Sequence, residues 1–381
     1  MAISLINETV ENKRVEFPIV EFDLKESLFL LKSSDELFQF AVEYKPKIDQ
    51  SFESKDFEIF FFSNQYLNAE NDVFEIYEKE LNKRIGWVFP IQVLESNEND
   101  FCDNIYFNKY KYSAFKKLLS ENPTKKQIYF GESLFHLTDF YHENIIVFVL
   151  SKETLGDNVF SILSYLPSFS NYGYYVWNEG HHQFFAEQQS IALKKRGQKR
   201  ITIQKSNLDI SQNQFLSDLY NKHLKSINHF LLKFYFLYQV IEYLMEENFD
   251  SDFSFLVDEY RNDKLSKNDL KERINSITKE RKSISSLFEK VTLDNDLKVD
   301  FIRDCKLLLD NFYSSPPNQI GDLLYDTRNL VVHRYREIMK DENNVRTLEL
   351  ITHQLELIIN DLIISYSPQQ AVIKHSGISA V

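Results

Sequence analysis

The hydrophobic pattern of this 381-residue chain changes its period near residues 206–214. Before this point, short β-branched and aromatic runs alternate with polar or turn-forming residues, which is typical of strands. These runs lie at 58–63, 86–94, 126–131, 144–151, 174–178 and 200–205. After it, apolar residues recur every three or four positions up to about residue 366, as in amphipathic helices. Since a chain of this length usually forms more than one core, the two patterns predict two domains.

We therefore expect an α+β protein with a β-rich mixed domain at 1–208, an all-α bundle at 209–366 and a disordered tail at 367–381. The first domain is expected to sense or regulate. Helical patterns predict helices over 72–84 and 113–121 within it. The bundle is expected to contain five helical segments, at 215–244, 270–291, 298–313, about 321–340 and from Asp341-Glu342-Asn343-Asn344 onward.

Charge and cysteine content limit the classes of function. The net charge of −13 argues against a protein that coats itself with nucleic acid, although a local basic patch can still bind RNA. Cys102 and Cys305 are too few for a disulfide framework or a four-thiolate zinc site, and they fit a reduced, cytoplasmic setting. The N-terminus shows no signal-peptide pattern. We expect neither a metal nor another cofactor.

The longest apolar stretch, 230–245, contains Lys233, Gln239 and Glu242. It is also shorter than the roughly 20 residues that a membrane span needs. We interpret it as a buried helix and expect no membrane association.

One segment carries residues suited to catalysis. LYDTRNLVVHRYREI (324–338) contains Arg328, Asn329 and His333. On a helix, Asn329 and His333 are four positions apart and share a face, while the long side chain of Arg328 can reach the same side. The apolar residues 330–332 between them supply the face that anchors the helix.

These residue types suit metal-independent cleavage of RNA. His333 can transfer a proton near neutral pH, and Arg328 can bind a phosphate through its planar fork of donors. Asn329 can orient the histidine or hydrogen-bond the ribose or phosphate. The nucleophile is then the 2′-hydroxyl of the RNA, so the products are a 2′,3′-cyclic phosphate or a 3′-phosphate and a 5′-hydroxyl. DNA lacks that hydroxyl and is not cut.

Other polar residues form a second rank of candidates. Glu242 and Gln239 fit a place beside the catalytic residues, but they equally fit a polar pair that fixes helix packing or faces water. Arg334 and Arg336 follow the motif and can guide RNA phosphates, or they stabilise the C-terminal end of a helix. The basic run at 194–205 fits RNA binding or a solvated hairpin, and its candidate RNA contacts are Lys194, Lys195 and Arg196.

The stretch with Arg328, Asn329 and His333 resembles the Arg-x4-6-His signature of HEPN domains, with Asn after the Arg. The helical context at about 212–366 resembles that family too, and most closely its ApeA-like members in bacterial antiphage defence. The resemblance implies a homodimeric endoribonuclease whose two motifs face each other in one cleft. It also implies a toxin that acts in abortive infection and awaits a phage-derived trigger or regulatory partner. The first 205 residues resemble no family.

Two alternatives remain open. The helical region is also consistent with a non-catalytic HEPN module that binds a nucleotide or a partner protein, such as the toxin half of a nucleotidyltransferase pair. A third interpretation is a scaffold whose helical region only oligomerises.

Overall fold

The computed structural model describes residues 3–7, 13–45, 56–64, 72–121, 123–125, 134–155, 160–178, 199–227, 229–291 and 293–367. The chain divides into two compact units. The β-rich unit comprises Met1–Ser161 and Tyr172–Gln204, and the helical unit comprises Ile162–Asn171 and Lys205–Val381. Because sheets dominate the first unit and helices the second, the predicted α+β class is confirmed.

The division differs from the expected one in one respect. The larger part of the helical unit begins at Lys205, close to the predicted boundary after residue 208. The unit also includes an earlier segment, Ile162–Asn171, which was not predicted to belong to it. This inserted segment lies amid strand signals and is too short to show a helical period of its own, so the sequence pattern does not reveal it.

The described strands of the β-rich unit form three sheets. The largest has the strand order β11-β6-β10-β8-β7-β12, and the others have the orders β3-β4-β5-β9 and β1-β2. Pairs β5–β9 and β7–β12 are parallel and the other described pairs are antiparallel. The strands are β1 (Ile3–Asn7), β2 (Lys13–Phe17), β3 (Ile19–Asp23), β4 (Leu28–Lys32), β5 (Gln39–Glu43), β6 (Phe57–Asn64), β7 (Phe74–Glu78), β8 (Lys83–Pro90), β9 (Leu134–Phe135), β10 (Ile146–Ser151), β11 (Tyr174–Val176) and β12 (Arg200–Ile203).

Helix α1 (Ile105–Leu118) joins two of these sheets through aromatic contacts. Phe107 lies 4.7 Å from Trp87 of β8, measured between ring centroids, and Phe115 lies 5.2 Å from Phe29 of β4. All four rings belong to one buried cluster, which accounts for the high aromatic content of the chain. The short helices of this unit are η2 (Ile91–Glu95), α2 (Leu137–Phe140) and α3 (Lys152–Leu155).

The helix predicted over 72–84 is wrong. Burial alternates along β7, where Phe74, Ile76 and Glu78 are buried and the residues between them are half-buried. That period of two belongs to a strand, and β7 forms an antiparallel hairpin with β8. Asn82 has a positive φ of 47° in the connecting turn, a conformation that asparagine tolerates.

Most of the other elements predicted for the β-rich unit are present. Strands β6, β10, β11 and β12 and helix α1 confirm the predicted elements at 58–63, 144–151, 174–178, 200–205 and 113–121. The run at 86–94 stays a strand only to Pro90 and continues as the 3-10 turn η2. The run at 126–131 lies outside the described residues. Strands β1 to β5 were not predicted.

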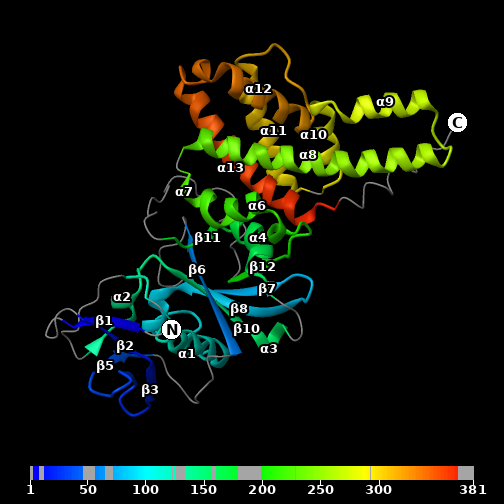
Figure 1. Cartoon of the computed structure of the whole chain (residues 1–381). Coiled ribbons are helices and arrows are strands. Elements are labelled where there is room, and N and C mark those ends of the chain that lie inside the picture. Colours follow the sequence, from blue (N-terminus) through cyan, green and yellow to red (C-terminus); the bar gives the residue numbers. More distant parts are fainter. Residues whose placement is uncertain are drawn as a thin grey trace. The chain divides into compact units, whose positions relative to one another are not determined.

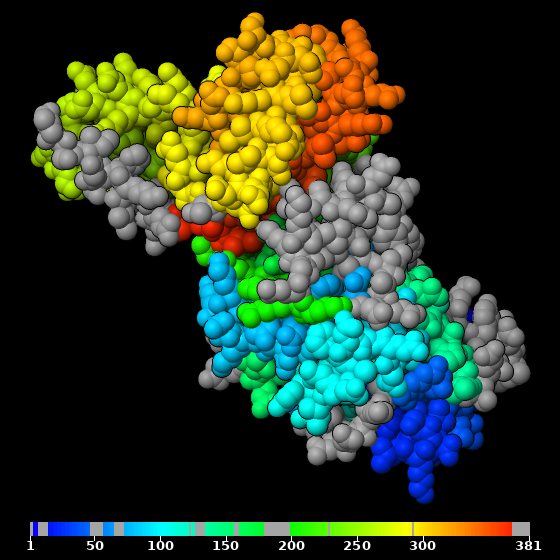
Figure 2. All heavy atoms as spheres, turned by 180° about the vertical axis from the view of Figure 1, so that it is seen from behind, coloured from blue at the N-terminus to red at the C-terminus, as the bar shows by residue number. Residues whose placement is uncertain are grey.

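The helical unit is built around a bundle of long helices (Figure 1). Helix α13 contacts α8 and α11, and α12 contacts α10 and α11. In Figure 1, the C-terminal part of α8 extends from the bundle together with α9. In Figure 2, α10 and α11 (yellow and gold) form part of the surface of the bundle. The elements are η3 (Ile162–Tyr165), α4 (Leu166–Ser170), η4 (Ile210–Gln212), α6 (Gln214–Asp218), η5 (Leu219–His223, a π-helical turn), α7 (Leu224–Ser226), α8 (Phe230–Arg261), α9 (Lys267–Ile277), α10 (Glu280–Glu289), α11 (Asn295–Asp310), α12 (Ile320–Ile338) and α13 (Glu342–Ser365).

Two of the five predicted helical segments are interrupted. The segment at 215–244 breaks between Ile227 and His229, whose backbones are extended. The segment at 270–291 breaks at Lys279, which precedes α10 with an extended backbone. Apolar residues keep a three-or-four spacing through the first break, and at the second Ile277 and Ile284 are seven residues apart, which is two helical turns. The period alone could therefore reveal neither break.

Helix α13 is buried on nearly every side. The predicted apolar stripe is confirmed by buried Leu348, Ile351, Leu355, Ile358 and Leu362. Most of the remaining turns are buried too, and they carry a second stripe of polar residues, His353, Glu356 and Asn360. The side chain of Asp341 caps the helix by accepting from the backbone N–H of Asn343.

No helix in the described part of the chain is both long and apolar enough to cross a membrane. Helix α8, which contains the predicted buried stretch at 230–245, buries Phe234, Leu237, Val240, Ile241 and Leu244. The tail predicted to be disordered lies outside the described residues from 368 onward.

The buried His353 makes the stability of the helical unit depend on pH. Burial lowers its pKa from 6.5 to about 4, with Lys233 also lowering it and Glu356 opposing the shift. Between pH 6.5 and 4 the histidine binds a proton in the unfolded chain but not in the folded one. The stability of the folded state is therefore full above about pH 6.5 and decreases as the pH falls toward 4. We expect the free energy of unfolding to drop by about 3 kcal/mol over this range.

Urea unfolding of wild type and His353→Gln at several pH values measures this effect. The variant is expected to have a flatter pH profile between 4 and 6.5. Equal slopes for the two proteins would contradict the assignment to His353.

Candidate active site

Helix α12 carries the three residues of the predicted motif. The helix lies tightly against α10 at its first turn, because a Cβ at Gly321 would meet the backbone of Ser285 at 2.7 Å. Leu330 and Val331 are buried as predicted, whereas Val332 is 40% exposed. The helix is kinked at Arg334, whose φ of −131° and ψ of 22° are not helical. The motif therefore lies on a fixed helix and ends just before a bend.

Arg328 is held by three neighbours. Its Nη1 donates to Asn329 Oδ1 at 3.1 Å, and its Nη2 lies 3.8 Å from Glu242 Oε1. Its guanidinium carbon lies 5.4 Å from the centre of the Tyr238 ring, within the range of a cation–π contact. Tyr238 and Glu242 are four residues apart on α8, so one face of α8 positions the arginine.

Tyr238 is itself fixed by α10. Its hydroxyl donates to Glu280 Oε1 at 2.8 Å. Burial raises the pKa of Tyr238, and the neighbouring Glu280 raises it further, so the phenol keeps its proton and remains a donor. Three helices thus meet at Arg328: α12 supplies the arginine, α8 the ring and α10 the carboxylate that fixes the ring.

His333 is placed differently. Its side chain is exposed, and we find no hydrogen bond or ion pair for it among the described residues. The described residues contain no hydrogen bond that links it to Arg328 or Asn329 either. The structure therefore brings Arg328 and Asn329 together and leaves the imidazole of His333 facing outward, available to a ligand or another chain.

Of the other candidate residues on α8 and α12, only some have contacts with neighbouring side chains. Glu242 contacts Arg328, whereas Gln239 is exposed. Arg334 forms an ion pair with Glu337 and lies 5.1 Å from the ring of Phe312. Arg336 is exposed. The basic residues Lys194, Lys195 and Arg196 lie outside the described part of the chain.

Three residues that matter here were not predicted: Tyr238, Glu280 and Arg281. Arg281 of α10 donates to Asp322 at 2.7 Å and to Asp326 at 2.9 Å, and these contacts tie α10 to α12 one turn from Arg328. The place of Tyr238 four residues before Glu242 was a visible signal, but the contacts of Glu280 and Arg281 depend on how α10 packs.

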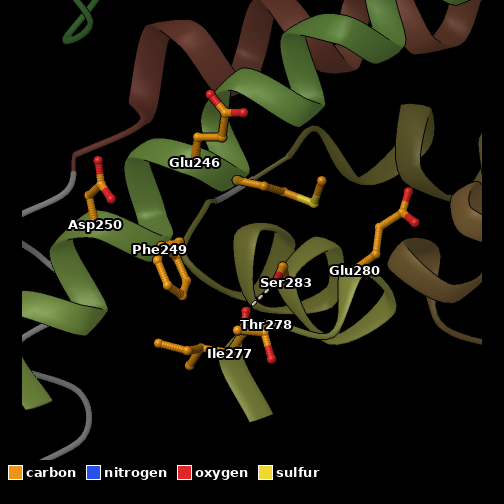
Figure 3. A pocket seen from close by; sticks show the side chains of 8 residues that line it. Glu246, Phe249, Asp250, Ile277, Thr278, Glu280 and Ser283 are labelled. Atoms are coloured by element: carbon orange, nitrogen blue, oxygen red, sulfur yellow. Dashed lines mark hydrogen bonds between the residues drawn. The ribbon is translucent and has the colours of Figure 1, made fainter. Parts of the chain in front are cut away.

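A shallow pocket of about 450 Å³ lies beside this cluster, between α8 and the α9–α10 region. In Figure 3 the ring of Phe249 on α8 points toward Ile277, whereas the side chains of Glu246 and Asp250, which also line the pocket, point away from it. The remaining lining residues are Met245, Thr278, Glu280 and Ser283. Three carboxylates line the pocket and make it unsuited to a phosphate. Glu280 belongs both to the pocket and to the support of Tyr238.

Within the described residues, no group of three or more His, Cys, Asp or Glu side chains is arranged to hold a metal ion. Comparisons with protein-family models, curated proteins and solved structures find no match to this chain. What can be said of its chemistry therefore rests on its own residues.

The contact between Tyr238 and Arg328 can be measured by substitution. Tyr238→Phe removes the hydroxyl bonded to Glu280 and is expected to lower the free energy of unfolding by about 1 kcal/mol. Tyr238→Leu also removes the ring beside Arg328 and is expected to cost about 0.5–1 kcal/mol more. Urea unfolding of the helical unit measures both.

The control is the same pair of substitutions in an Arg328→Ala background. There the difference between Phe and Leu at position 238 is expected to shrink, because the cation is gone. An unchanged difference would show that the ring acts through packing alone.

Proposed function

We propose that the helical unit is a metal-independent endoribonuclease of the HEPN type. His333 transfers the proton between the 2′-hydroxyl and the leaving oxygen, Arg328 binds the phosphate, and Asn329 positions the arginine. The main support for this proposal is that two residues of the motif contact each other while the third is exposed. Arg328 and Asn329 form a supported pair, and His333 lies one turn further along the same helix with its ring exposed.

An exposed histidine suits a site that is completed by a second copy of the chain. Val332 and Met339, on the same helix as His333, are apolar and 40% and 48% exposed. Covering such side chains in a homodimer is favourable and would bring two motifs into one cleft. The exposed Arg336 nearby would add attraction for RNA in a chain whose net charge is −13.

In the proposed site, Glu242 is the partner of Arg328 when no RNA is bound. Its carboxylate lies 3.8 Å from the guanidinium of Arg328, where a phosphate oxygen of RNA would bind. RNA therefore has to replace Glu242 as the partner of Arg328. We propose that such a nuclease serves as a cytoplasmic toxin in abortive-infection defence, held inactive until a phage-derived trigger or a regulatory partner acts.

One observation favours the alternative, a non-catalytic HEPN module that binds a nucleotide or a partner protein. Arg328 already has three intramolecular neighbours, which also suits a purely structural role. The two functions differ in what His333 does, so substitution of His333 separates them.

The experiment compares wild type, His333→Ala and the control His136→Ala on RNA. His136 is a histidine of the β-rich unit whose side chain is 48% exposed. Wild type and His136→Ala are expected to fragment RNA and leave 2′,3′-cyclic phosphate ends, with EDTA present and with no cleavage of DNA of the same sequence. His333→Ala is expected to be at least about 100-fold slower, since a general acid–base contributes that much or more.

Circular dichroism confirms that the three proteins fold alike. If purified wild type is inactive, the same three proteins are compared for growth and RNA integrity in cells during phage challenge. Cleavage by His333→Ala at the wild-type rate would overturn the assignment of the site. An absence of cleavage by any of them in both settings would favour the binding module.

A further inference from the structure

The segment Ile162–Asn171, here the coupling segment, belongs to the helical unit although the residues on both sides of it belong to the β-rich unit. It comprises η3 and α4, and α4 packs against α13. The chain therefore enters the helical unit once, returns to the β-rich unit for residues 172–204, and enters again at Lys205.

Three hydrogen bonds hold the end of the coupling segment on α13. Ser170 Oγ donates to Glu356 Oε1 at 3.1 Å, and Asn171 Nδ2 donates to Asp361 Oδ1 at 3.1 Å. Asn360 Nδ2 donates to Asn171 Oδ1 at 3.0 Å. Ser170, Glu356 and Asn360 are each at most 3% exposed, so losing these bonds leaves polar groups buried without compensation.

The next residue is fixed in the other unit. The side chain of Asn64 on β6 donates to the carbonyl oxygen of Tyr172 at 3.0 Å, and the Tyr172 hydroxyl donates to the carbonyl oxygen of Thr202 at 3.2 Å. Asn171 and Tyr172 are consecutive, yet each is hydrogen-bonded within a different unit. Only one peptide bond separates these two sets of hydrogen bonds.

The contacts continue from α13 to the candidate site. Glu356 Oε2 lies 2.5 Å from Nζ of Lys233, which is on α8. The same helix carries Tyr238 and Glu242, the two residues that hold Arg328. Ser170 and Lys233 thus share one buried carboxylate, and a change at Ser170 alters the charge environment of the helix that supports Arg328.

We propose that the coupling segment transmits a structural change in the β-rich unit to Arg328 through Glu356 and Lys233. That this transmission regulates RNA cleavage rests on the proposed function, but the transmission itself can be measured without RNA. Such coupling requires an element that has two positions, and in this proposal that element is α4 with the three hydrogen bonds that hold its end on α13.

The test is amide hydrogen exchange on the full chain. In Ser170→Ala/Asn171→Ala, the peptides covering Lys233–Glu242 and Arg328 are expected to exchange about tenfold faster, which corresponds to the loss of roughly one net hydrogen bond. Asn311→Ala is the matched control, because it removes a different hydrogen bond to α13, the one to Asn344 at 2.8 Å. It is expected to leave those peptides unchanged.

A second comparison starts from the β-rich unit. Asn64→Ala removes the bond to Tyr172 and is expected to speed exchange in the same peptides of the helical unit. In the Ser170→Ala/Asn171→Ala background the effect of Asn64→Ala is expected to vanish, because the connection is already broken. If the double variant does not fold, Asn171→Ala alone takes its place.

The proposal is overturned if Asn64→Ala leaves the helical unit unchanged, or if Asn311→Ala speeds exchange at Arg328 as much as the double variant does. RNA cleavage by the same proteins is measured in parallel. Faster exchange with no cleavage by wild type would support the coupling and count against the nuclease, so the two proposals fail independently.

Discussion

The buried pair of Glu356 and Lys233 is the interaction around which the helical unit is organised. Glu356 is 1% exposed at the centre of α13, and a carboxylate in such a place must be paired or the helix will not stay buried. Lys233 supplies the opposite charge from α8 and Ser170 supplies a hydroxyl from α4. Removing Lys233 leaves the Glu356 carboxylate without an opposite charge, which costs far more than the pair itself contributes, and removing Ser170 takes away one of its hydrogen-bond donors. The requirement for both partners fixes how three separate parts of the chain assemble.

Much of the fold could be predicted from local patterns, and the failures have physical causes. The period of the helical region placed α11, α12 and α13 within a few residues, because each has one clear apolar face. The helix predicted over 72–84 failed because Phe74, Tyr77 and Leu81 keep a three-or-four spacing across what is in fact the turn of a hairpin. The extra segment from 162 to 171 could not be predicted, since its place depends on contacts with residues nearly 190 positions later.

In the candidate site, too, some residues could be predicted from the sequence and others could not. Arg328, Asn329 and His333 could be named because their spacing on one helix carries the argument. Glu242 could be suspected as a charge inside an apolar stretch. Tyr238, four residues before Glu242, could have been suspected with it, but the supporting role of Glu280 could not, because it arises from the packing of α10 against α8. Motif residues are local in sequence, whereas the residues that orient them are brought together only by the fold.

The order in which the helical unit is assembled has a consequence for synthesis of the protein. Its first segment, Ile162–Asn171, is made well before its hydrogen-bond partners on α13, which follow it by 186 and 190 residues. A unit whose first part binds α13 cannot complete its core until α13 has also left the ribosome. Any activity that depends on α12 being held in place therefore begins only after α13 is available.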